Sequence, residues 1–338
     1  MIKYSIIIPT CNNELISRNL LHISKLNSPL SDYEVIVIQN KEDGNIENTV
    51  KSYIDKIPNL RFFKEETPGL LYCRHRGAKE ANGEVLCYLD DDSFVDKNWL
   101  VEIEKTFKKN PQALIVGGSN IPCYEVKPPK WLKYWWVENS FCKCLTSLSL
   151  IEFKNKNMKV PAWNVYGCNF IIKKDALYKF GGFNPDGVPK DLLKYRGDGE
   201  TALSLKLNSA GHAAYINPKI KVYHYVPQSR MTLEYFNKRA YAQGISDSFT
   251  NIRKNNGIEY AEYVPAKECD PERKLNCFKR LYNKLKKRLS KHTKEYKTFI
   301  NIYKEYEKSY KEGYDFHQQA IKNDSEVLNY VLKSTFLE

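Results

Sequence analysis

The stretch Val85-Leu86-Cys87-Tyr88-Leu89-Asp90-Asp91-Asp92-Ser93 decides the fold, because an apolar run delivers three consecutive carboxylates to its end. Residues 84–89 are typical of a buried β-strand. Three carboxylates at its edge repel one another, and a hard divalent cation is the simplest group that offsets the repulsion. Mg²⁺ usually takes one or two protein carboxylates and completes its shell with substrate phosphates. The stretch therefore predicts a site for a metal and a diphosphate, with a polar turn after a buried strand as the alternative.

Similar apolar runs recur along the chain and are typical of strands buried on both faces. They occupy residues 4–9, 34–38, 60–63, 113–117, 167–172 and 220–225. Helical spacing fills residues 15–25, 45–56, 72–82, 98–109 and 198–209. This alternation predicts an α/β fold, a mostly parallel sheet with helices on both faces. Residues 121–165 are aromatic and lack a clear period, so we expect irregular chain there, either a core flap or a wall of a substrate cleft.

Ligands of such sheets bind at the carboxyl ends of the strands, where several polar residues of this sequence fall. Asp91 is expected to hold ribose hydroxyls, and Asp92 to bind a metal that neutralises a leaving diphosphate. Arg74 precedes the acidic triplet and suits planar anion recognition. The residues expected to bind a nucleotide donor are Pro9, Thr10, Cys11, Glu14, Gln39, Asn40, Arg74, Asp90, Asp91 and Asn169.

Two further carboxylates and a histidine are candidates for the chemistry. Asp198 and Glu200 stand at the predicted start of a helix, where either could take the proton of an attacking hydroxyl as a general base. Simple helix capping is the alternative for Asp198. His224 ends a predicted strand and could complete the metal shell through a ring nitrogen, although a lone histidine at a strand end more often has a structural role.

Composition restricts the partners and the compartment. The chain has 338 residues, a net charge of +13 and nine cysteines without a C-x-x-C pair. The charge favours anionic partners, among them nucleotides, lipid headgroups, acidic glycans and nucleic acid. Unpaired cysteines, an opening strand in place of a signal peptide, and no apolar run near the roughly 20 residues of a membrane span predict a cytoplasmic protein.

Beyond about residue 265 the sequence becomes rich in Lys, Tyr and Asn. Residues 278–297 have the pattern of a basic amphipathic helix, which either packs on the rest of the protein or attaches it peripherally to anionic lipid on the inner face of the membrane. We therefore expect a first domain over 1–250, with a nucleotide-binding half (1–118) and an acceptor-binding half (119–250). A basic helical extension over 265–338 follows it.

Taken in order, these motifs resemble those of the large glycosyltransferase family 2, which has the GT-A fold. The motifs lie at residues 6–10, 35–40, 77–84, 89–92, 181–183 and 198–201, and the resemblance covers roughly residues 3–250. It implies an inverting, metal-dependent hexosyl- or acetylhexosaminyl-transferase with a nucleoside diphosphate sugar as donor, UDP-sugar being favoured. The acceptor is expected to be a hydroxyl of a glycan, a lipid-linked oligosaccharide or a polysaccharide.

The resemblance also implies roles for particular residues. Asp90 to Asp92 match the motif that binds donor and metal, with Mn²⁺ or Mg²⁺ as the cofactor, and His224 matches a histidine that can bind the metal. Glu200 falls at the position of the catalytic base. The segment that contains Arg230, Arg239 and Gly244 resembles one whose basic residues meet the diphosphate.

The sequence departs from the family pattern at several of these positions. Gln39 replaces a usual aspartate, Cys11 an aromatic residue and His75 an asparagine. The usual Glu-Asp pair appears as Gly199-Glu200, so Glu200 is the first choice for the base and Asp198 the second.

Two other functions remain open from the sequence. A metal-dependent nucleotidyltransferase would usually carry a glycine-rich phosphate loop after the first strand, and residues 9–13 contain no glycine. A non-catalytic protein that binds nucleic acid or other anions would fit the charge of +13, but acidic strand ends argue against a polyanion on that face. A homo-oligomer stays an open alternative.

Overall fold

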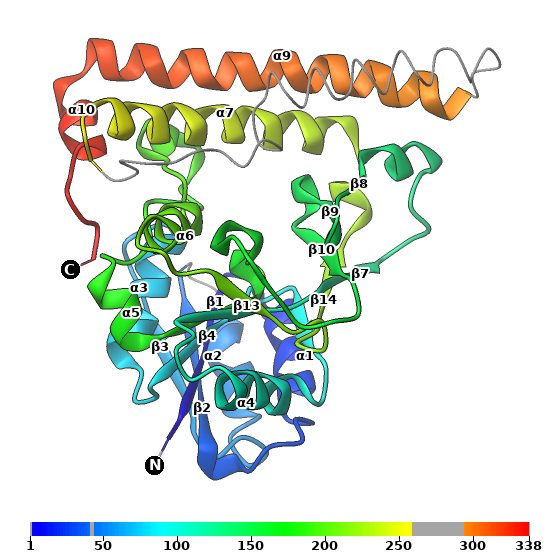
Figure 1. The fold of residues 1–338 in the computed structure, drawn as a ribbon, viewed down its shortest axis with the longest axis vertical. Helices are drawn as coiled ribbons and strands as arrows, with labels where there is room; N and C mark the ends of the chain where they lie inside the picture. Colours follow the sequence, from blue (N-terminus) through cyan, green and yellow to red (C-terminus); the bar gives the residue numbers. More distant parts are fainter. Residues whose placement is uncertain (1, 41–43, 259–293, 338) are drawn as a thin grey trace.

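An eight-stranded sheet forms the centre of the computed structural model, which describes residues 2–40, 44–258 and 294–337 (Figure 1). Its strand order is β11-β13-β6-β12-β4-β1-β2-β3. Strands β4, β1, β2 and β3 are parallel, whereas β12 runs antiparallel to both of its neighbours. The strands are β1 (Tyr4–Thr10), β2 (Tyr33–Gln39), β3 (Leu60–Lys64), β4 (Val85–Tyr88), β6 (Ile115–Gly117), β11 (Met158–Val160), β12 (Phe170–Lys173) and β13 (Ala214–Ile216). The predicted α/β architecture is confirmed.

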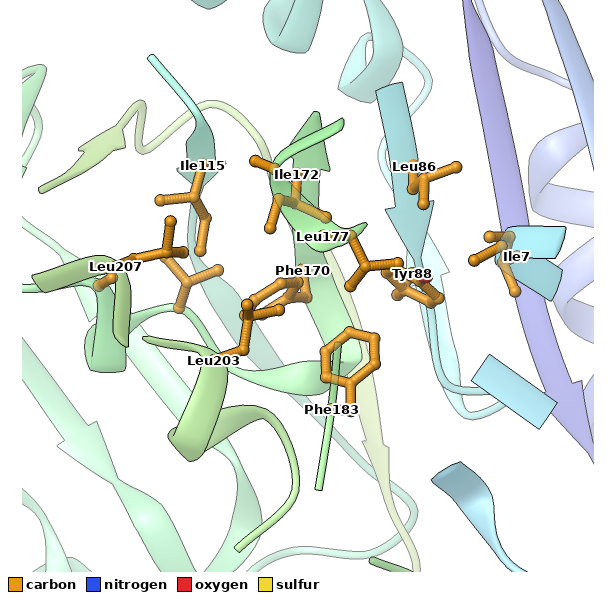
Figure 2. Close-up of a cluster of buried hydrophobic side chains, with 14 of the residues drawn as sticks. Ile7, Leu86, Tyr88, Ile115, Phe170, Ile172, Leu177, Phe183, Leu203 and Leu207 are labelled. Carbon is orange, nitrogen blue, oxygen red and sulfur yellow. The ribbon is translucent and has the colours of Figure 1, made fainter. Parts of the chain in front are cut away.

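Helices cover both faces of this sheet because its strands are apolar on both sides. Along β1, Ile6 and Ile8 face one helical layer and Ile7 faces the other, as the two-residue period of a strand requires. The first layer consists of α1 (Asn13–Ile23), α2 (Gly44–Lys51) and α4 (Trp99–Lys109), and the second of α3 (Leu70–Glu80), α5 (Lys174–Lys179) and α6 (Glu200–Ser209). Figure 2 shows the second layer, where Phe183 packs edge-on against Tyr88.

A second sheet of six strands lies beside the carboxyl end of β4, in the order β5-β14-β7-β10-β9-β8. Its strands are β5 (Ser93–Val95), β7 (Asn120–Tyr124), β8 (Val137–Glu138), β9 (Cys142–Leu145), β10 (Leu150–Phe153) and β14 (Val222–Val226). The expectation of irregular chain over 121–165 is therefore wrong. Between residues 120 and 153 these strands are two to five residues long and mix buried, half-buried and exposed residues without regular alternation, so they leave no period for the sequence to reveal. The expected strand at 167–172 begins instead with a 3-10 turn, Gly167–Asn169.

Two long helices, α7 (Leu233–Asn255) and α9 (Lys294–Asn323), run side by side along one end of the molecule (Figure 1). Their backbones touch at two glycines: a Cβ on Gly244 would lie 2.1 Å from the carbonyl oxygen of Tyr310, and one on Gly313 would lie 2.0 Å from that of Tyr241. No side chain larger than hydrogen fits at either position. The contact therefore holds the helices at one register.

The last helix, α10 (Ser325–Val331), is fastened to the body of the protein by a buried arginine. Arg253 of α7 donates to the carbonyl oxygens of Val331 and Lys333, and Phe336 is buried beside it. The described C-terminal residues thus pack on α7 and reach the turn at Gly181, whose carbonyl oxygen accepts from the Thr335 hydroxyl. Of the predicted basic helix, residues 278–293 lie outside the described residues and 294–297 begin α9, so the membrane hypothesis stays a prediction. None of the described helices is long and apolar enough to cross a membrane.

Candidate active site

The three aspartates lie in the loop between β4 and β5, and neighbouring elements hold that loop in place. The side-chain amide of Asn19, on the buried face of α1, donates to the backbone carbonyls of Asp90 and Ser93 at 3.1 and 3.0 Å. The Thr10 hydroxyl, at the end of β1, donates to Asp91 Oδ2 at 2.7 Å. The loop is thus tied to α1 and β1. Asn19 was missed by the sequence analysis, although an asparagine among Ile16, Leu20 and Ile23 on one helix face was a signal.

Asp92 contacts two basic side chains that lie far from it in the sequence, those of His224 and Arg230. Its Oδ1 lies 3.2 Å from His224 Nε2, and its Oδ2 lies 2.7 Å from the guanidinium of Arg230. Strand β14 brings His224 into this position because His224 pairs with Ser93 of β5. Burial opposes the ionisation of Asp92, but His224 and Arg230 outweigh it and lower its pKa to about 2. The carboxylate is therefore kept charged.

The pKa of Asp91 is shifted in the opposite direction from that of Asp92. Burial, with the neighbouring charge of Asp92, raises the pKa of Asp91 to about 7, although the Thr10 hydroxyl favours its charged form. No basic side chain contacts Asp91 within the described part of the chain. A cation or a donor hydroxyl at this position would supply the missing partner.

The side chains fit a divalent metal whose remaining ligands come from a bound phosphate group. Among the described residues, no group of three or more His, Cys, Asp and Glu side chains is arranged to hold a metal. Asp92 and His224 nevertheless offer an oxygen and a nitrogen that already lie together, and Nδ1 of the buried His224 has no hydrogen-bond partner in the described structure. Mg²⁺ sites commonly use one or two protein carboxylates and fill the other positions with water and phosphate oxygens.

Arg74 joins the acidic loop to the start of α6. Its guanidinium lies 3.4 Å from Asp90 Oδ1 and 3.2 Å from Glu200 Oε2, and its side chain is only 3% exposed. The backbone N–H of Gly167 donates to Glu200 Oε1 at 2.9 Å, so each carboxylate oxygen of Glu200 has its own donor. A Cβ on Gly167 would lie 2.4 Å from the guanidinium of Arg74, so a larger residue at this position would displace the guanidinium. The sequence analysis missed Gly167.

Asp198 is committed to structural hydrogen bonds. It accepts from the Asn184 side chain at 2.9 Å and from the Thr250 hydroxyl at 2.6 Å, one bond to each oxygen. Gly199 follows it with φ +56°, and a Cβ there would lie 3.0 Å from the carboxylate of Asp186. The glycine at this position is therefore required by the turn, which explains the departure from the usual acidic residue.

The remaining residues expected to bind the donor fall into two groups. Gln39 lies opposite Thr10 at the ends of β2 and β1, and both side chains are buried. Asn40 holds the loop between β3 and α3 in place. Its side chain donates to the carbonyl of Thr67 at 2.7 Å and accepts from the N–H of Gly69 at 2.8 Å. The residues at the edge of the first loop are Pro9, which is buried in β1, and Cys11 and Glu14, which are exposed.

Two of the expected donor ligands instead have structural partners. Asn169 is 1% exposed, accepts from the Trp99 indole at 3.0 Å and donates to the carbonyl of Ile220 at 3.2 Å, so its side chain is not offered to a ligand. Arg74 is equally enclosed and is bound to Asp90 and Glu200. For both residues the expectation of a direct donor contact is replaced by a supporting role.

Comparison with protein families gives a match to glycosyl transferase family 2 over residues 5–181, which is just over half of the chain. The chain belongs to glycosyl transferase family 2. It is accordingly an enzyme of the glycosyltransferase class, and the acidic loop and most of the donor-side strands lie inside the matched segment.

Individual relatives of this family 2 chain are distant. It is 22% identical over 220 residues to a glucosyl-dolichyl phosphate glucuronosyltransferase of Haloferax volcanii, with 63% of this chain and 66% of the relative covered. It is 31% identical over 105 residues to the poly(ribitol-phosphate) β-N-acetylglucosaminyltransferase TarS of Staphylococcus aureus, with 30% and 18% covered. The chain thus spans two-thirds or less of the length of these relatives.

Solved structures confirm the GT-A fold. A mannosyltransferase from Pyrobaculum calidifontis, in complex with GDP-Man and Mn²⁺, aligns with a TM-score of 0.56 at 17% identity, covering 91% of this chain and 85% of that one. Residues 1–349 of S. aureus TarS align with a TM-score of 0.50 at 16% identity, covering 94% and 92%. At such low identity the likeness concerns the fold alone.

Proposed function

We propose that this protein is an inverting glycosyltransferase that moves a sugar from a nucleoside diphosphate donor to an acceptor hydroxyl, with Glu200 as general base. The observation that supports it is the placement of Glu200, one quarter exposed, across a single buried arginine from the acidic loop. A base held this close to a donor site can act on a hydroxyl that approaches the donor sugar. Asp198 is the weaker candidate because its two hydrogen-bond partners lie outside the acidic loop, whereas Glu200 shares Arg74 with that loop.

The reaction is a single displacement at the anomeric carbon of the donor sugar. The acceptor oxygen forms a bond to that carbon on the face opposite the diphosphate, and the bond between the carbon and the leaving phosphate oxygen breaks. Glu200 takes the acceptor proton as the new bond forms. Arg74 and the Gly167 N–H each bind one oxygen of the carboxylate and so orient it.

The acidic loop and its partners hold the leaving diphosphate in this proposal. Asp92 and His224 would bind Mn²⁺ or Mg²⁺, which as a Lewis acid stabilises the charge that develops on the diphosphate. Arg230 lies beside Asp92 and can turn its guanidinium towards phosphate oxygens, since bidentate phosphate binding suits arginine. Thr10 and Asp91 would then border the ribose.

The chemical classes of the donor and the acceptor are proposed from the donors that such enzymes most often use and from the similar proteins named above. A UDP-sugar is the favoured donor, and the TarS structures in complex with UDP and UDP-GlcNAc are compatible with it, whereas the Pyrobaculum structure holds GDP-Man. We further propose an acceptor in cell-surface glycan synthesis, either polysaccharide or lipid-linked. The similarity to TarS and to the glucosyl-dolichyl phosphate glucuronosyltransferase supports this class.

The deciding experiment measures hydrolysis of the donor, with water as the acceptor. UDP-GlcNAc, UDP-glucose, GDP-mannose and dTDP-glucose are each incubated with Mn²⁺ or with EDTA, and the released nucleoside diphosphate is quantified. We expect metal-dependent release from one nucleotide class, with inversion at the anomeric carbon seen by proton NMR of the fresh product. Retention of configuration, or equal release in EDTA, would contradict the proposal.

A further inference from the structure

A pocket of about 570 Å³ lies outside the acidic loop, between the 3-10 helix Lys130–Trp135, the start of α7, and α9. Its volume is within the range of small-ligand sites. No residue that lines it takes part in the proposed chemistry. Three segments that are far apart in the sequence meet in it, and α9 supplies one whole wall.

The floor of the pocket is rigid and aromatic. Trp131 lines it, and its indole packs edge-on against the fully buried Phe236 with 5.3 Å between ring centroids. Met231 and Ile302, both buried in the same cluster, complete the apolar surface. An ion pair between Lys130 and Glu295, 3.4 Å apart, links the 3-10 helix to α9. The ring of Trp131 is therefore oriented before any ligand arrives, and flat apolar rings of this kind pack against the faces of sugars.

The walls of the pocket are polar and, taken together, uncharged. Thr232, Thr298 and Asn301 contribute hydroxyl and amide groups. The charged lining residues among those described are Lys304 and Glu305, which have opposite signs. In a chain with a net charge of +13, a site for a phosphate-rich or acidic ligand would show an excess of basic groups, and this pocket shows none.

The pocket also adjoins the proposed catalytic residues through the backbone. Met231 and Thr232 directly follow Arg230, whose guanidinium contacts Asp92 at 2.7 Å. Neighbouring Cα atoms are about 3.8 Å apart, so the pocket begins within a few residues' reach of the acidic loop. A saccharide chain with one end at the acidic loop could therefore place a later unit in the pocket.

We propose that this pocket binds a neutral saccharide unit of the acceptor, one or more residues away from the hydroxyl that reacts. The inference rests on the proposed function and deepens it, because it selects an uncharged glycan acceptor over a polyol-phosphate or polyuronate one. Trp131 supplies the stacking surface, and Asn301 the hydrogen bonds that select hydroxyl-rich ligands.

Saturation-transfer NMR on the full chain tests the proposal with chosen probes. The neutral probes are maltotriose, mannotriose and tri-N-acetylchitotriose, and the acidic probe is trigalacturonate. Asn301→Arg fills the pocket and adds a charge at an exposed position on α9. Gln319→Arg is the matched control, since it adds the same side chain at another exposed position of that helix, outside the pocket.

We expect at least one neutral trisaccharide to bind the unmodified protein, Asn301→Arg to weaken it at least tenfold, and Gln319→Arg to leave it unchanged. Donor hydrolysis by Gln319→Arg should equal that of the unmodified protein, because this position lies outside both the pocket and the proposed catalytic residues. The proposal is overturned if no neutral probe binds, if trigalacturonate binds equally well, or if Asn301→Arg binds as tightly as the unmodified protein. Loss of the proposed function alone would appear differently, as saccharide binding that responds to Asn301→Arg without any donor hydrolysis.

Discussion

The acidic end of β4 and the acidic start of α6 both bury carboxylates, but they stabilise them with different partners. At β4, the charge of Asp92 is balanced by His224 and Arg230, while Asp91 has no cationic contact and its pKa rises to about 7. At α6, Asp198 is held by two neutral donors, and Glu200 by one arginine and one backbone N–H. Arg74 is the bridge between the two regions.

The difference indicates which carboxylates are available for chemistry. The two neutral hydrogen bonds to Asp198 fix its position in the turn that precedes α6, which is typical of a structural carboxylate. A carboxylate whose partners leave part of it exposed to solvent, as in Glu200, can still receive a proton. Each of the following experiments removes one partner from one of the two regions.

The largest effect is expected from a substitution of the proposed base. Glu200→Gln keeps the shape of the side chain but removes its basicity, so kcat should fall by about 10²–10⁴-fold while donor affinity stays within a few fold. Steady-state transfer or hydrolysis, together with donor titration, measures both quantities. Asp198→Asn is the control: it should lower the melting temperature and leave kcat within about tenfold. The reverse pattern would make Asp198 the base.

The next effect concerns the acidic loop. Asp92→Asn removes the charge that faces His224 and Arg230, so donor turnover should drop by about 10²-fold and lose its dependence on Mn²⁺. A thermal shift with donor, recorded with Mn²⁺ and with EDTA, reads the metal dependence without catalysis. If the variant keeps the difference between Mn²⁺ and EDTA, Asp92 is not a metal ligand.

A smaller loss of activity should follow from a substitution of Arg74, which contacts both Asp90 and Glu200. Arg74→Lys keeps a positive charge but cannot contact Asp90 and Glu200 at once, so we expect kcat to fall about tenfold with a modest loss of stability. Gly167→Ala should also lower kcat by displacing the guanidinium. Steady-state transfer or hydrolysis measures kcat, and an unchanged kcat in both variants would limit Arg74 to a packing role.

The half-buried side chain of His75 extends the comparison to the stability of the fold. Burial lowers the pKa of His75 to about 4, and its Nε2 accepts from the N–H of Phe183 at 3.0 Å. Between pH 4 and 6.5 the unfolded chain binds a proton at this position and the folded protein does not, so stability is present above pH 6.5 and is lost as the pH falls. At pH 5 this corresponds to about 2 kcal/mol.

Urea unfolding across this pH range checks the expectation for His75. His75→Gln should flatten the pH dependence of the free energy of unfolding. His212→Gln, at a position far from Phe183 in the sequence, should leave this pH dependence unchanged. An equally steep dependence in His75→Gln would place the responsible proton elsewhere, with His317 as the next candidate because burial lowers its pKa to about 4 as well.

Six strands of the central sheet could be predicted from the sequence because they lie in continuous apolar runs, whereas its three-residue strands β11 and β13 were not predicted. A strand such as β2 is apolar at nearly every position, and this pattern depends only on residues within the strand. In the second sheet only β14 was predicted, and the other strands follow no such local rule. In β8 both residues are exposed, and their strand conformation comes from pairing with β9. Its formation depends on contacts that the local sequence does not display.

The candidate site divides in the same way. The sequence placed Asp90, Asp92 and Glu200 because their residue types and their positions at element ends are local facts. It could not separate Asp198 from Glu200, since the groups that distinguish them lie far away along the chain. Asn184 and Thr250 are 14 and 52 residues from Asp198, and Arg74 is 126 residues from Glu200. Arg74 was therefore expected on the donor, whereas the structure shows it between two carboxylates.

The glycine contact between α7 and α9 has a mechanical consequence. A helix of 30 residues such as α9 is about 45 Å long, and the close approach of Gly244 and Gly313 prevents it from sliding along α7. The helix is therefore fixed against α7 about two-thirds of the way along its length. Its first turns line the pocket that is proposed to bind a saccharide, and its other end leads through α10 to the buried Phe336 beside Arg253. Because the helix cannot slide, the wall that it gives to the pocket should keep its position when a ligand binds.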